Sequence, residues 1–281
     1  MAGYANDVLV ETDWLAQHAK DPSVRVFEVD VDTSAYDQGH VAGAIGLNWK
    51  TDLQQHPVRD LIDKKQLEAL LSKNGVTPST TIVAYGDNNN WFAAWFFWLL
   101  KYYGHKEVKL VNGGRAKWVA ESRPLTTDAA AYPRAEYRAS GPDASIRALR
   151  DLVLEKVHSG STRIVDVRSP KEYAGELLAP ENLPQEGAQR GGHIPGAQNV
   201  PWATAVAEDG RFKTADELRS IYGNKGIDGT GETVAYCRIG ERSAHTWFVL
   251  KYLLGHDRVR NYDGSWTEWG SMVGVPIEKS A

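Results

Sequence analysis

The residues best suited to chemistry are seven consecutive ones near the end of the chain. They are Cys237, Arg238, Ile239, Gly240, Glu241, Arg242 and Ser243. Cys237 ends the run TVAYC, which has the composition of a short buried strand, and an apolar helical segment follows the loop. Because reactive groups in parallel α/β domains collect at the carboxyl ends of strands, this position favours a reactive cysteine over an inert one.

The sequence around Cys237 predicts that its thiol ionises easily. A lone cysteine is more often a small buried hydrophobe than a nucleophile, but the polar loop that follows argues against an inert core thiol. The N-terminus of a helix carries about half a positive charge and unpaired N–H groups. Such settings lower a cysteine pKa from ~8.5 into the range of ~3.5 to 7.5. We therefore predict a thiolate that needs no general base.

Two arginines close to Cys237 predict a site for an anionic reactant. The planar guanidinium of arginine donates two hydrogen bonds at once to an oxyanion, and loop amides can form an anion-binding nest. A thiolate about 4 Å from a unit negative charge is repelled by about 4 kcal/mol at an effective dielectric of about 20. Arg238, Arg242 and the helix dipole would offset this repulsion. Glu241 is predicted either to orient Arg242 or to face water.

Comparison of the chain with itself shows that it is a tandem repeat. Four pairs of blocks recur in the same order: VFEVD and IVDVR, GHVAGAIGLNW and GHIPGAQNVPW, TIVAYG and TVAYC, GHKEVKLVNGGRAKW and GHDRVRNYDGSWTEW. Since short strands alternate with helical segments, each half is predicted to be a small α/β domain, with a parallel sheet and helices on both faces. In this alignment Gly86 stands opposite Cys237, so the first half is predicted to be inactive.

The repeat sets the predicted domain boundaries. Residues 1–125 form the inactive domain and residues 144–281 the catalytic domain, whose active loop is 237–243. Residues 126–143 are rich in alanine, proline and polar residues and are predicted to be a linker. Residues 175–191 have no counterpart in the first half and are predicted to form a surface loop.

Composition restricts the function further. The 281 residues suffice for two domains, and 42% hydrophobic and 24% charged residues are typical of a soluble protein. A net charge of −4 does not favour nucleic acid or an anionic membrane as a partner. The N-terminus lacks the features of a signal peptide, and the apolar segment 91–100 is about half the ~20 residues needed to span a bilayer. A single cysteine excludes internal disulfides and cysteine-cluster metal sites, so a cytoplasmic location is expected.

These motifs resemble the rhodanese family, in particular its two-domain thiosulfate sulfurtransferases. The resemblance covers both halves and depends on CRIGERS, on GHVAGA and GHIPGA, on DVR at 166–168 and on NYDGSWTEW. It implies two tandem rhodanese-like domains, the second with the active cysteine. It also implies a double displacement in which the Cys237 thiolate takes the sulfane sulfur of thiosulfate and sulfite leaves. The resulting persulfide then passes its sulfur to cyanide or another thiophilic acceptor.

The resemblance also implies roles for the loop. Arg238 and Arg242 would bind the sulfonate end of the donor and stabilise the leaving sulfite. The backbone amides of residues 239–243 would surround the persulfide. No metal or organic cofactor is expected, because the cysteine itself carries the sulfur. The expected partners are a small anionic sulfur donor and a thiophilic acceptor, either a small molecule or a protein.

Alternative functions remain open at this point. Some thiosulfate enzymes of the family carry lysine where this chain has Ile239, and the mercaptopyruvate branch tends to carry glycine where this chain has Arg238. We therefore favour thiosulfate over 3-mercaptopyruvate as the donor. A protein-to-protein persulfide relay would use the same chemistry at Cys237. A cysteine-dependent phosphatase is disfavoured, because its loop has five residues between cysteine and arginine and this loop has four.

Other residues have predicted roles outside the loop. Asp166 and Arg168 end a strand and are predicted to pair with each other or with neighbours of the active loop, and a structural ion pair is favoured over contact with the substrate. Trp91 and Phe92 follow the inactive loop and are predicted either to wall the active site or to belong to a helix core. Because matching GH blocks occur in both halves and only one half has a nucleophile, His40 and His193 are predicted to be structural.

Overall fold

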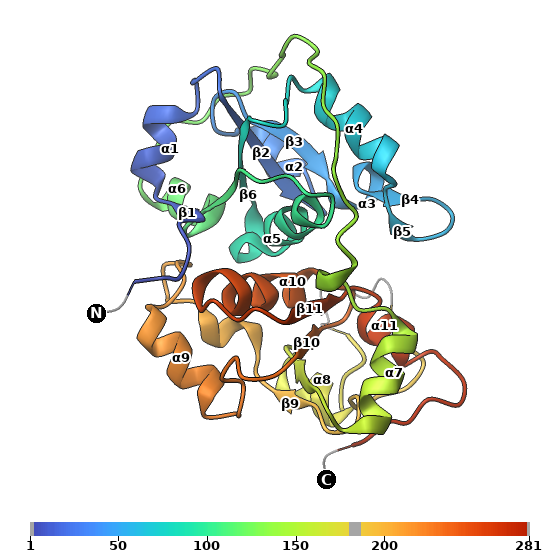
Figure 1. The fold of residues 1–281 in the computed structure, drawn as a ribbon. Coiled ribbons are helices and arrows are strands. Elements are labelled where there is room, and N and C mark those ends of the chain that lie inside the picture. Colours follow the sequence, from blue (N-terminus) through green and yellow to red (C-terminus); the bar gives the residue numbers. More distant parts are fainter. Residues whose placement is uncertain (1–2, 180–186, 280–281) are drawn as a thin grey trace. The chain divides into compact units, whose positions relative to one another are not determined.

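The structure is a computed structural model that describes residues 3–179 and 187–279. Its chain divides into two compact units (Figure 1). The first unit comprises residues 7–143 and 208–212, and the remaining described residues form the second. Residues 180–186 of the predicted surface loop 175–191 lie outside the described residues.

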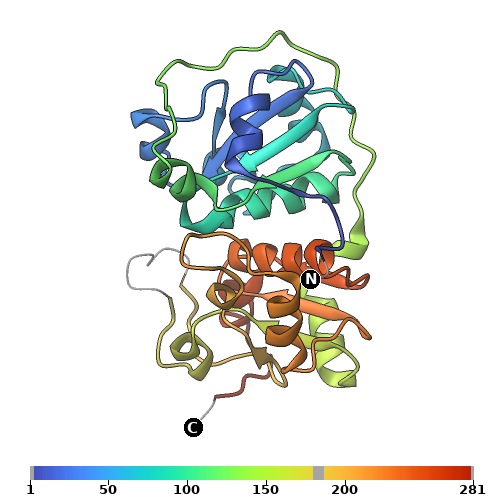
Figure 2. The same ribbon diagram turned by 90° about the vertical axis from the view of Figure 1, so that its left-hand side faces the viewer.

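These units differ from the predicted domain boundaries at the predicted linker. Residues 126–143 belong to the first unit, and their long extended course around its outside is visible in Figure 2. The segment is held there by hydrogen bonds. Thr126 N–H donates to the carbonyl oxygen of His40 at 2.9 Å, and Ala135 N–H donates to that of Ser72 at 3.0 Å. The composition of the segment did not reveal these long-range bonds.

Two short segments also lie outside their predicted domains. The amide of Phe212 donates to Asn112 Oδ1 at 3.0 Å, which joins residues 208–212 to the first unit. Near the N-terminus, the amide of Ala5 donates to the carbonyl oxygen of Leu253 at 2.9 Å, which joins that end of the chain to the second unit.

The first unit contains a five-stranded parallel sheet in the order β1-β7-β6-β2-β3. Its strands are β1 (Leu9–Val10), β2 (Val24–Asp30), β3 (Ile45–Asn48), β6 (Thr81–Tyr85) and β7 (Val108–Val111). Its helices are α1 (Thr12–His18), α2 (Ser34–Gln38), α3 (Trp49–Asp52), α4 (Lys64–Lys73), α5 (Asp87–Tyr102) and α6 (Gly114–Ala120). A short antiparallel pair, β4 (Gln54–Gln55) and β5 (Asp60–Leu61), extends from α3.

The second unit contains a four-stranded parallel sheet in the order β11-β10-β8-β9. Its strands are β8 (Arg163–Asp166), β9 (Gln198–Asn199), β10 (Thr233–Tyr236) and β11 (Val259–Tyr262). Its helices are α7 (Arg150–Ser159), α8 (Pro170–Ala174), α9 (Ala215–Gly223), α10 (Glu241–Phe248) and α11 (Ser265–Trp269). Short helical turns occur at Ala144–Ile146 and Trp202–Ala205, and a π-helical turn, Val249–Leu253, continues α10.

The two sheets confirm the predicted duplication. The strand order β7-β6-β2-β3 of the first unit matches β11-β10-β8-β9 of the second. The paired GH blocks also have equivalent structures, because the backbone of His40 bridges to Thr126 and that of His193 bridges to Glu278. Each of these histidines hydrogen-bonds through Nδ1 to a carbonyl oxygen of its own unit at 2.9 Å, which is consistent with the predicted structural role.

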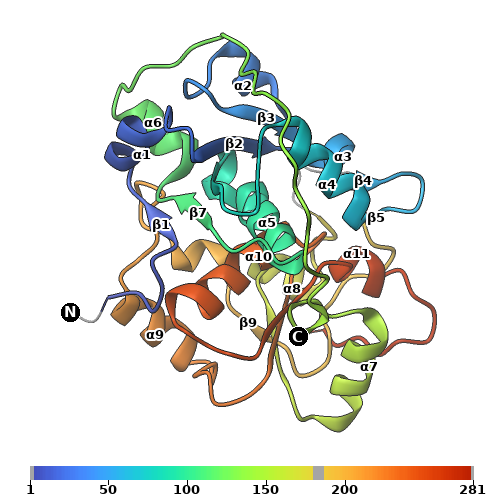
Figure 3. The same ribbon diagram turned by 45° about the horizontal axis from the view of Figure 1, so that its top comes forward.

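Helices cover both faces of the sheets, as predicted. In the first unit, α1 and α6 lie together on one side of the sheet, and α5 lies on the other (Figures 1 and 3). Val26 of β2 belongs to the same buried cluster as Leu15 of α1 and Trp118 of α6. The next residue of β2, Phe27, faces the other way and contacts Phe96 of α5 at a ring-centroid distance of 5.3 Å. Side chains of a strand alternate between faces, so β2 is buried on both.

Residues 92–100 of the apolar segment 91–100 are buried within α5, as the composition predicts, and Trp91 is partly buried. Within residues 3–179 and 187–279, no helix is both long and apolar enough to cross a membrane.

Candidate active site

Cys237 is fixed at the carboxyl end of β10 by the first residues of α11. The amide of Cys237 donates to Ser265 Oγ at 3.0 Å, and its carbonyl oxygen accepts from the amide of Trp266 at 3.0 Å. Ser265 has the left-handed backbone conformation, with φ of 53°. Sequence reasoning missed the role of Ser265, although its signal was the repeated block around NYDGSW.

The loop folds back so that a backbone amide points at the sulfur. The amide of Gly240 donates to Cys237 Sγ at 3.1 Å, and Ser243 Oγ lies 3.6 Å from the same atom. Gly240 has φ of 102°, and a Cβ there would lie 2.8 Å from Asp263 Cα. Only glycine fits this position. Asp263 is itself held by Arg147, whose Nε and Nη2 each donate to its carboxylate at 2.9 Å.

The predicted easy ionisation of Cys237 is wrong. The side chain is completely buried, and burial raises the pKa of the thiol above its ordinary value. The carboxylate of Glu241 raises this pKa further, and Arg242 and Ser243, which act in the opposite direction, do not offset the two effects. The spacing of the arginines was visible in the sequence, but the burial of the sulfur was not, and burial disfavours a charged thiolate.

Glu241 does not face water. It is completely buried, and its Oε2 accepts a hydrogen bond from Cys237 Sγ at 3.3 Å. The other carboxylate oxygen, Oε1, lies 3.5 Å from Nε of Arg242. Glu241 therefore lies between the sulfur and the arginine, which the sequence spacing did not reveal.

Arg242 is bound to a carboxylate that sequence reasoning missed. Its Nη1 and Nη2 each donate to one oxygen of Glu172 at 3.0 Å, and both side chains are at most 4% exposed. Burial raises the pKa of Glu172, but the hydrogen bonds and charge of Arg242 more than offset this, so the pKa lies below its ordinary value. Glu172 caps α8 together with Ser169, and the SPKE capping motif was its only local signal.

The charges of the active loop and its partners balance. Arg238 and Ile239 are both buried, with 3% and 4% of their surfaces exposed. The cations Arg238 and Arg242 are thus accompanied by the carboxylates of Glu172 and Glu241. The loop therefore carries less net positive charge than its two arginines alone suggested.

Asp166 and Arg168 pair with each other beneath the active loop. Both side chains are completely buried, and Arg168 Nη2 lies 2.5 Å from Asp166 Oδ2. Tyr236, which directly precedes Cys237, donates from its hydroxyl to Asp166 Oδ2 at 2.6 Å. The Arg168 guanidinium lies 4.5 Å from the ring centroid of Trp266. The pair connects the end of β8 to both chain segments that hold Cys237.

Comparisons with known proteins identify the family. A model of the rhodanese-like domain matches residues 11–121 and again residues 149–272. The chain belongs to the rhodanese family. Its two units are therefore rhodanese domains, as the resemblance implied.

Relatives of this rhodanese are similar over its whole length. A Mycolicibacterium smegmatis protein named "Putative thiosulfate sulfurtransferase" is 56% identical over 97% of this chain and 98% of its own. The Thermus thermophilus sulfur carrier protein TtuD is 56% identical over 99% of both chains. SseA from Escherichia coli, a solved structure described with 3-mercaptopyruvate sulfotransferases, is 26% identical with a TM-score of 0.79, over 93% of this chain and 99% of its own. These relatives support sulfur transfer as the class of reaction.

The first rhodanese domain has no room for a cysteine opposite Cys237. Gly86 follows β6 as Cys237 follows β10, but a Cβ at Gly86 would lie 2.5 Å from the carbonyl oxygen of Val29. The three residues Asn88 to Asn90 have the left-handed conformation, with φ between 49° and 66°. The loop of this domain therefore differs from the active loop in backbone shape as well as in sequence.

We expect that Gly86→Cys does not create a second reactive site. The new side chain collides with the backbone of β2, so the variant should lose about 1 to 3 kcal/mol of stability, as is typical of overpacking. Chemical denaturation of Gly86→Cys and of the matched variant Gly86→Ala measures this loss. In the Gly86→Cys/Cys237→Ser double variant, intact mass should show no bound sulfur after incubation with thiosulfate. A sulfur adduct on that protein would contradict the expectation.

Phe92 belongs to the core of the first rhodanese domain. It is 2% exposed, and its ring centroid lies 5.2 Å from that of Trp49. Trp91 is only partly buried. A contribution of either residue to a wall of the active site stays a prediction.

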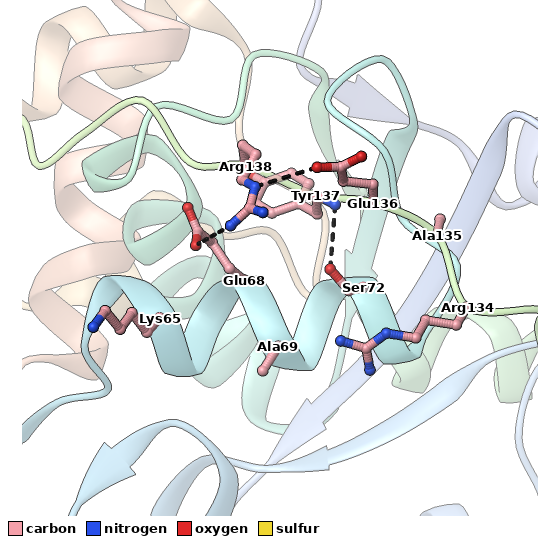
Figure 4. Close-up of a pocket in the computed structure, with 9 residues that line it drawn as sticks. All are labelled: Lys65, Glu68, Ala69, Ser72, Arg134, Ala135, Glu136, Tyr137 and Arg138. Atoms are coloured by element: carbon pink, nitrogen blue, oxygen red, sulfur yellow. Dashed lines mark hydrogen bonds and ion pairs between the residues drawn. The ribbon is translucent and has the colours of Figure 1, made fainter.

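A separate hollow of about 460 Å³ lies on the first rhodanese domain, between α4 and the extended segment 134–138 (Figure 4). Three of its charged side chains interact, since Arg138 lies 3.7 Å from Glu68 and 3.4 Å from Glu136. Ser72 Oγ accepts a hydrogen bond from the amide of Tyr137 at 3.2 Å. Glu68 and Ser72 of α4 thus hold the extended segment on the helix, and we assign no reaction to this hollow.

Metal-binding side chains do not gather in the parts of the chain that the structure describes: no group of three or more histidine, cysteine, aspartate or glutamate residues there is placed to hold an ion.

Proposed function

We propose that this rhodanese is a thiosulfate sulfurtransferase in which Cys237 holds the transferred sulfur as a persulfide. The observation that carries the proposal is the position of Cys237 Sγ at the N-terminus of α10, 3.1 Å from the amide of Gly240. Backbone amides at such a position favour the negative charge that a persulfide carries. The name of the Mycolicibacterium relative supports thiosulfate as the donor.

The proposed reaction has two displacements. Cys237 Sγ attacks the sulfane sulfur of thiosulfate and forms a new S–S bond, while the old S–S bond breaks and its electron pair leaves with sulfite. Cyanide or another thiophilic acceptor then attacks the outer sulfur of the persulfide, and Cys237 leaves as the thiolate. In this scheme no metal or organic cofactor takes part, because the cysteine itself is the carrier.

The two arginines contribute differently to the proposed donor site. The terminal nitrogens of Arg242 donate to Glu172. Arg242 therefore supplies positive charge near the sulfur, while these two nitrogens are occupied by the carboxylate. Arg238 is the second cation of the loop, directly after Cys237. We propose that donor binding uses the charge of both arginines together with the loop amides.

A second candidate is a relay in which the sulfur acceptor is another protein. The observation that favours it is the 56% identity to a protein named as a sulfur carrier. The balance of charge at the loop also fits a donor or acceptor less anionic than thiosulfate. The chemistry at Cys237 is the same in both cases, and only the partner differs.

Intact mass after incubation with thiosulfate tests the proposal. We expect the protein to gain the mass of one sulfur atom, and cyanide to remove it with formation of thiocyanate. A gain from 3-mercaptopyruvate but not from thiosulfate would reassign the donor. If cyanide does not remove the added sulfur but a purified sulfur-carrier protein does, the result would favour the relay. Hydrolysis of an aryl phosphate without any sulfur gain would exclude a sulfurtransferase.

A further inference from the structure

The Cys237 sulfur contacts the carboxylate of Glu241. Sγ donates to Glu241 Oε2 at 3.3 Å, and both side chains are completely buried. We propose that Glu241 is a catalytic residue that takes the thiol proton from Cys237 and holds it while the cysteine carries sulfur. This inference rests on the proposed persulfide chemistry of Cys237.

A proton acceptor is needed because the buried thiol does not ionise easily on its own. Burial raises the pKa of Cys237, and a protonated thiol is a poor nucleophile. If the proton instead moves to Glu241, the sulfur gains its charge and the carboxylate loses its own. The total charge of the Cys237–Glu241 pair then stays at one negative charge, which costs less in a buried site than two.

Glu241 is the group beside the sulfur that can accept this proton. Hydrogen-bond partners of Sγ among the described residues are Glu241, the amide of Gly240 and Ser243 through its hydroxyl and backbone, and of these only the carboxylate is a base. His245 of the same helix does not compete, because burial lowers its pKa to about 3.

Charged groups surround Glu241 and hold it in place. Arg242 Nε lies 3.5 Å from Glu241 Oε1, and Arg242 is itself bound to Glu172 on α8. Further charged groups at the loop are Arg238, the Asp166–Arg168 pair and the Asp263–Arg147 pair beneath Gly240. Nε of Arg242 thus approaches Oε1 of Glu241, whereas Oε2 is the oxygen that accepts from Cys237 Sγ.

The proton follows a closed cycle in this proposal. As Sγ bonds to the sulfane sulfur, its proton passes to Glu241 Oε2, and the electron pair of the broken S–S bond leaves with sulfite. When the acceptor removes the outer sulfur, the electron pair of the persulfide bond returns to Cys237 Sγ, and Glu241 returns the proton to it. Thiosulfate and cyanide are thus converted to sulfite and thiocyanate without net uptake or release of a proton.

The variant Glu241→Gln tests the proposal through its pH profile, since glutamine keeps the volume but accepts no proton. We expect sulfur uptake from thiosulfate, measured in a single turnover, to fall by about 10²-fold at pH values well below the thiol pKa. The rate should recover toward that of the natural protein as rising pH ionises the thiol directly. The matched control is Glu232→Gln, which removes a carboxylate of the same domain that pairs with Arg260, and it should leave the profile unchanged.

Other profiles would overturn the proposal. A uniform loss at every pH would assign Glu241 a structural role. Equal or faster uptake at low pH would mean that its charge merely suppresses thiol ionisation, because the carboxylate raises the pKa of Cys237.

Two further measurements separate this proposal from the proposed function. The pH profile of Cys237 alkylation by iodoacetamide compares the natural protein and Glu241→Gln without any sulfur donor, so it applies even if thiosulfate is not the substrate. We expect alkylation of the natural protein to persist to lower pH than that of the variant. The infrared difference spectrum of the persulfide form should show a protonated carboxyl group that Glu241→Gln lacks. If intact mass shows the persulfide but the natural protein lacks this band, the proposed role of Glu241 is overturned and the proposed function is not.

Discussion

Replacing Cys237 with serine is expected to abolish sulfur transfer and to leave the fold intact. A hydroxyl cannot form the persulfide, so the variant should gain no sulfur from thiosulfate and produce no thiocyanate. Its hydroxyl can donate to Glu241 Oε2 and accept from the amide of Gly240, as the thiol does. Because no buried polar group loses its partner, the free energy of unfolding should change by less than about 1.5 kcal/mol. Intact mass, thiocyanate formation and chemical denaturation measure these three quantities.

The matched variant Cys237→Ala separates chemistry from packing. It should be equally inactive, but it leaves Glu241 Oε2 and the Gly240 amide without the partner that the sulfur provides. Loss of a partner from buried polar groups costs about 1 to 3 kcal/mol, so this variant should be less stable than Cys237→Ser. Sulfur transfer by either variant would exclude Cys237 as the carrier. Unfolding of Cys237→Ser would instead indicate a structural cysteine.

The fold could be predicted because its signals are local and occur twice. The blocks VFEVD, TIVAYG, IVDVR and TVAYC, which contain strand residues of β2, β6, β8 and β10, are short and rich in β-branched residues, and four pairs of blocks recur in the same order in both halves. The position of Cys237 at a strand end followed directly from this repeat. The predicted linker was the exception: residues 126–143 have the composition of a connection, but the bonds of Thr126 and Ala135 to distant residues attach them to the first unit.

The two halves form equivalent buried ion pairs from different residues, which the sequence alone does not show. In the second unit the buried carboxylate Asp166 is paired with Arg168 of the same strand end. In the first unit the equivalent carboxylate, Glu28, is paired at 2.7 Å with Arg115 from α6, and the position equivalent to Arg168 is Asp30. The arginine of the pair thus follows β8 in the second unit, whereas in the first unit it comes from α6. A pair two residues apart in the sequence is easy to predict, whereas a pair 87 residues apart is not.

The electrostatics of the active loop could not be predicted from the loop alone. CRIGERS shows two arginines beside a cysteine, and this pattern indicates a thiolate. Burial of Cys237 and the approach of Glu241 reverse that expectation. Glu172, which binds Arg242, lies 70 residues earlier in the chain. The sign of a pKa shift depends on such tertiary contacts and on exposure, and neither is a property of a seven-residue pattern.

Removing either partner of the Glu172–Arg242 pair is expected to cost about 3 to 5 kcal/mol of stability, because it leaves the other charge buried and uncompensated. The variants Glu172→Ala and Arg242→Ala measure this in chemical denaturation. Their double variant should lose less than the sum of the two, since it leaves neither charge unpaired. A simple sum would mean that the two side chains contribute independently. We expect Arg242→Ala also to slow sulfur uptake from thiosulfate, since it removes a cation near Cys237.

The same pair should make stability depend on acid. The pKa of Glu172 is lowered from its ordinary value of 4.5, so the unfolded chain binds the proton more tightly than the folded one. The contribution of this carboxylate is therefore complete above about pH 4.5 and is lost as the pH falls through the lowered pKa. In the double variant Glu172→Gln/Arg242→Met this part of the acid dependence should disappear. If the free energy of unfolding fell with acid as steeply in that variant as in the natural protein, other carboxylates would account for the dependence. The pair joins α8 to the first turn of α10, so its loss would release the helix whose N-terminus faces the Cys237 sulfur.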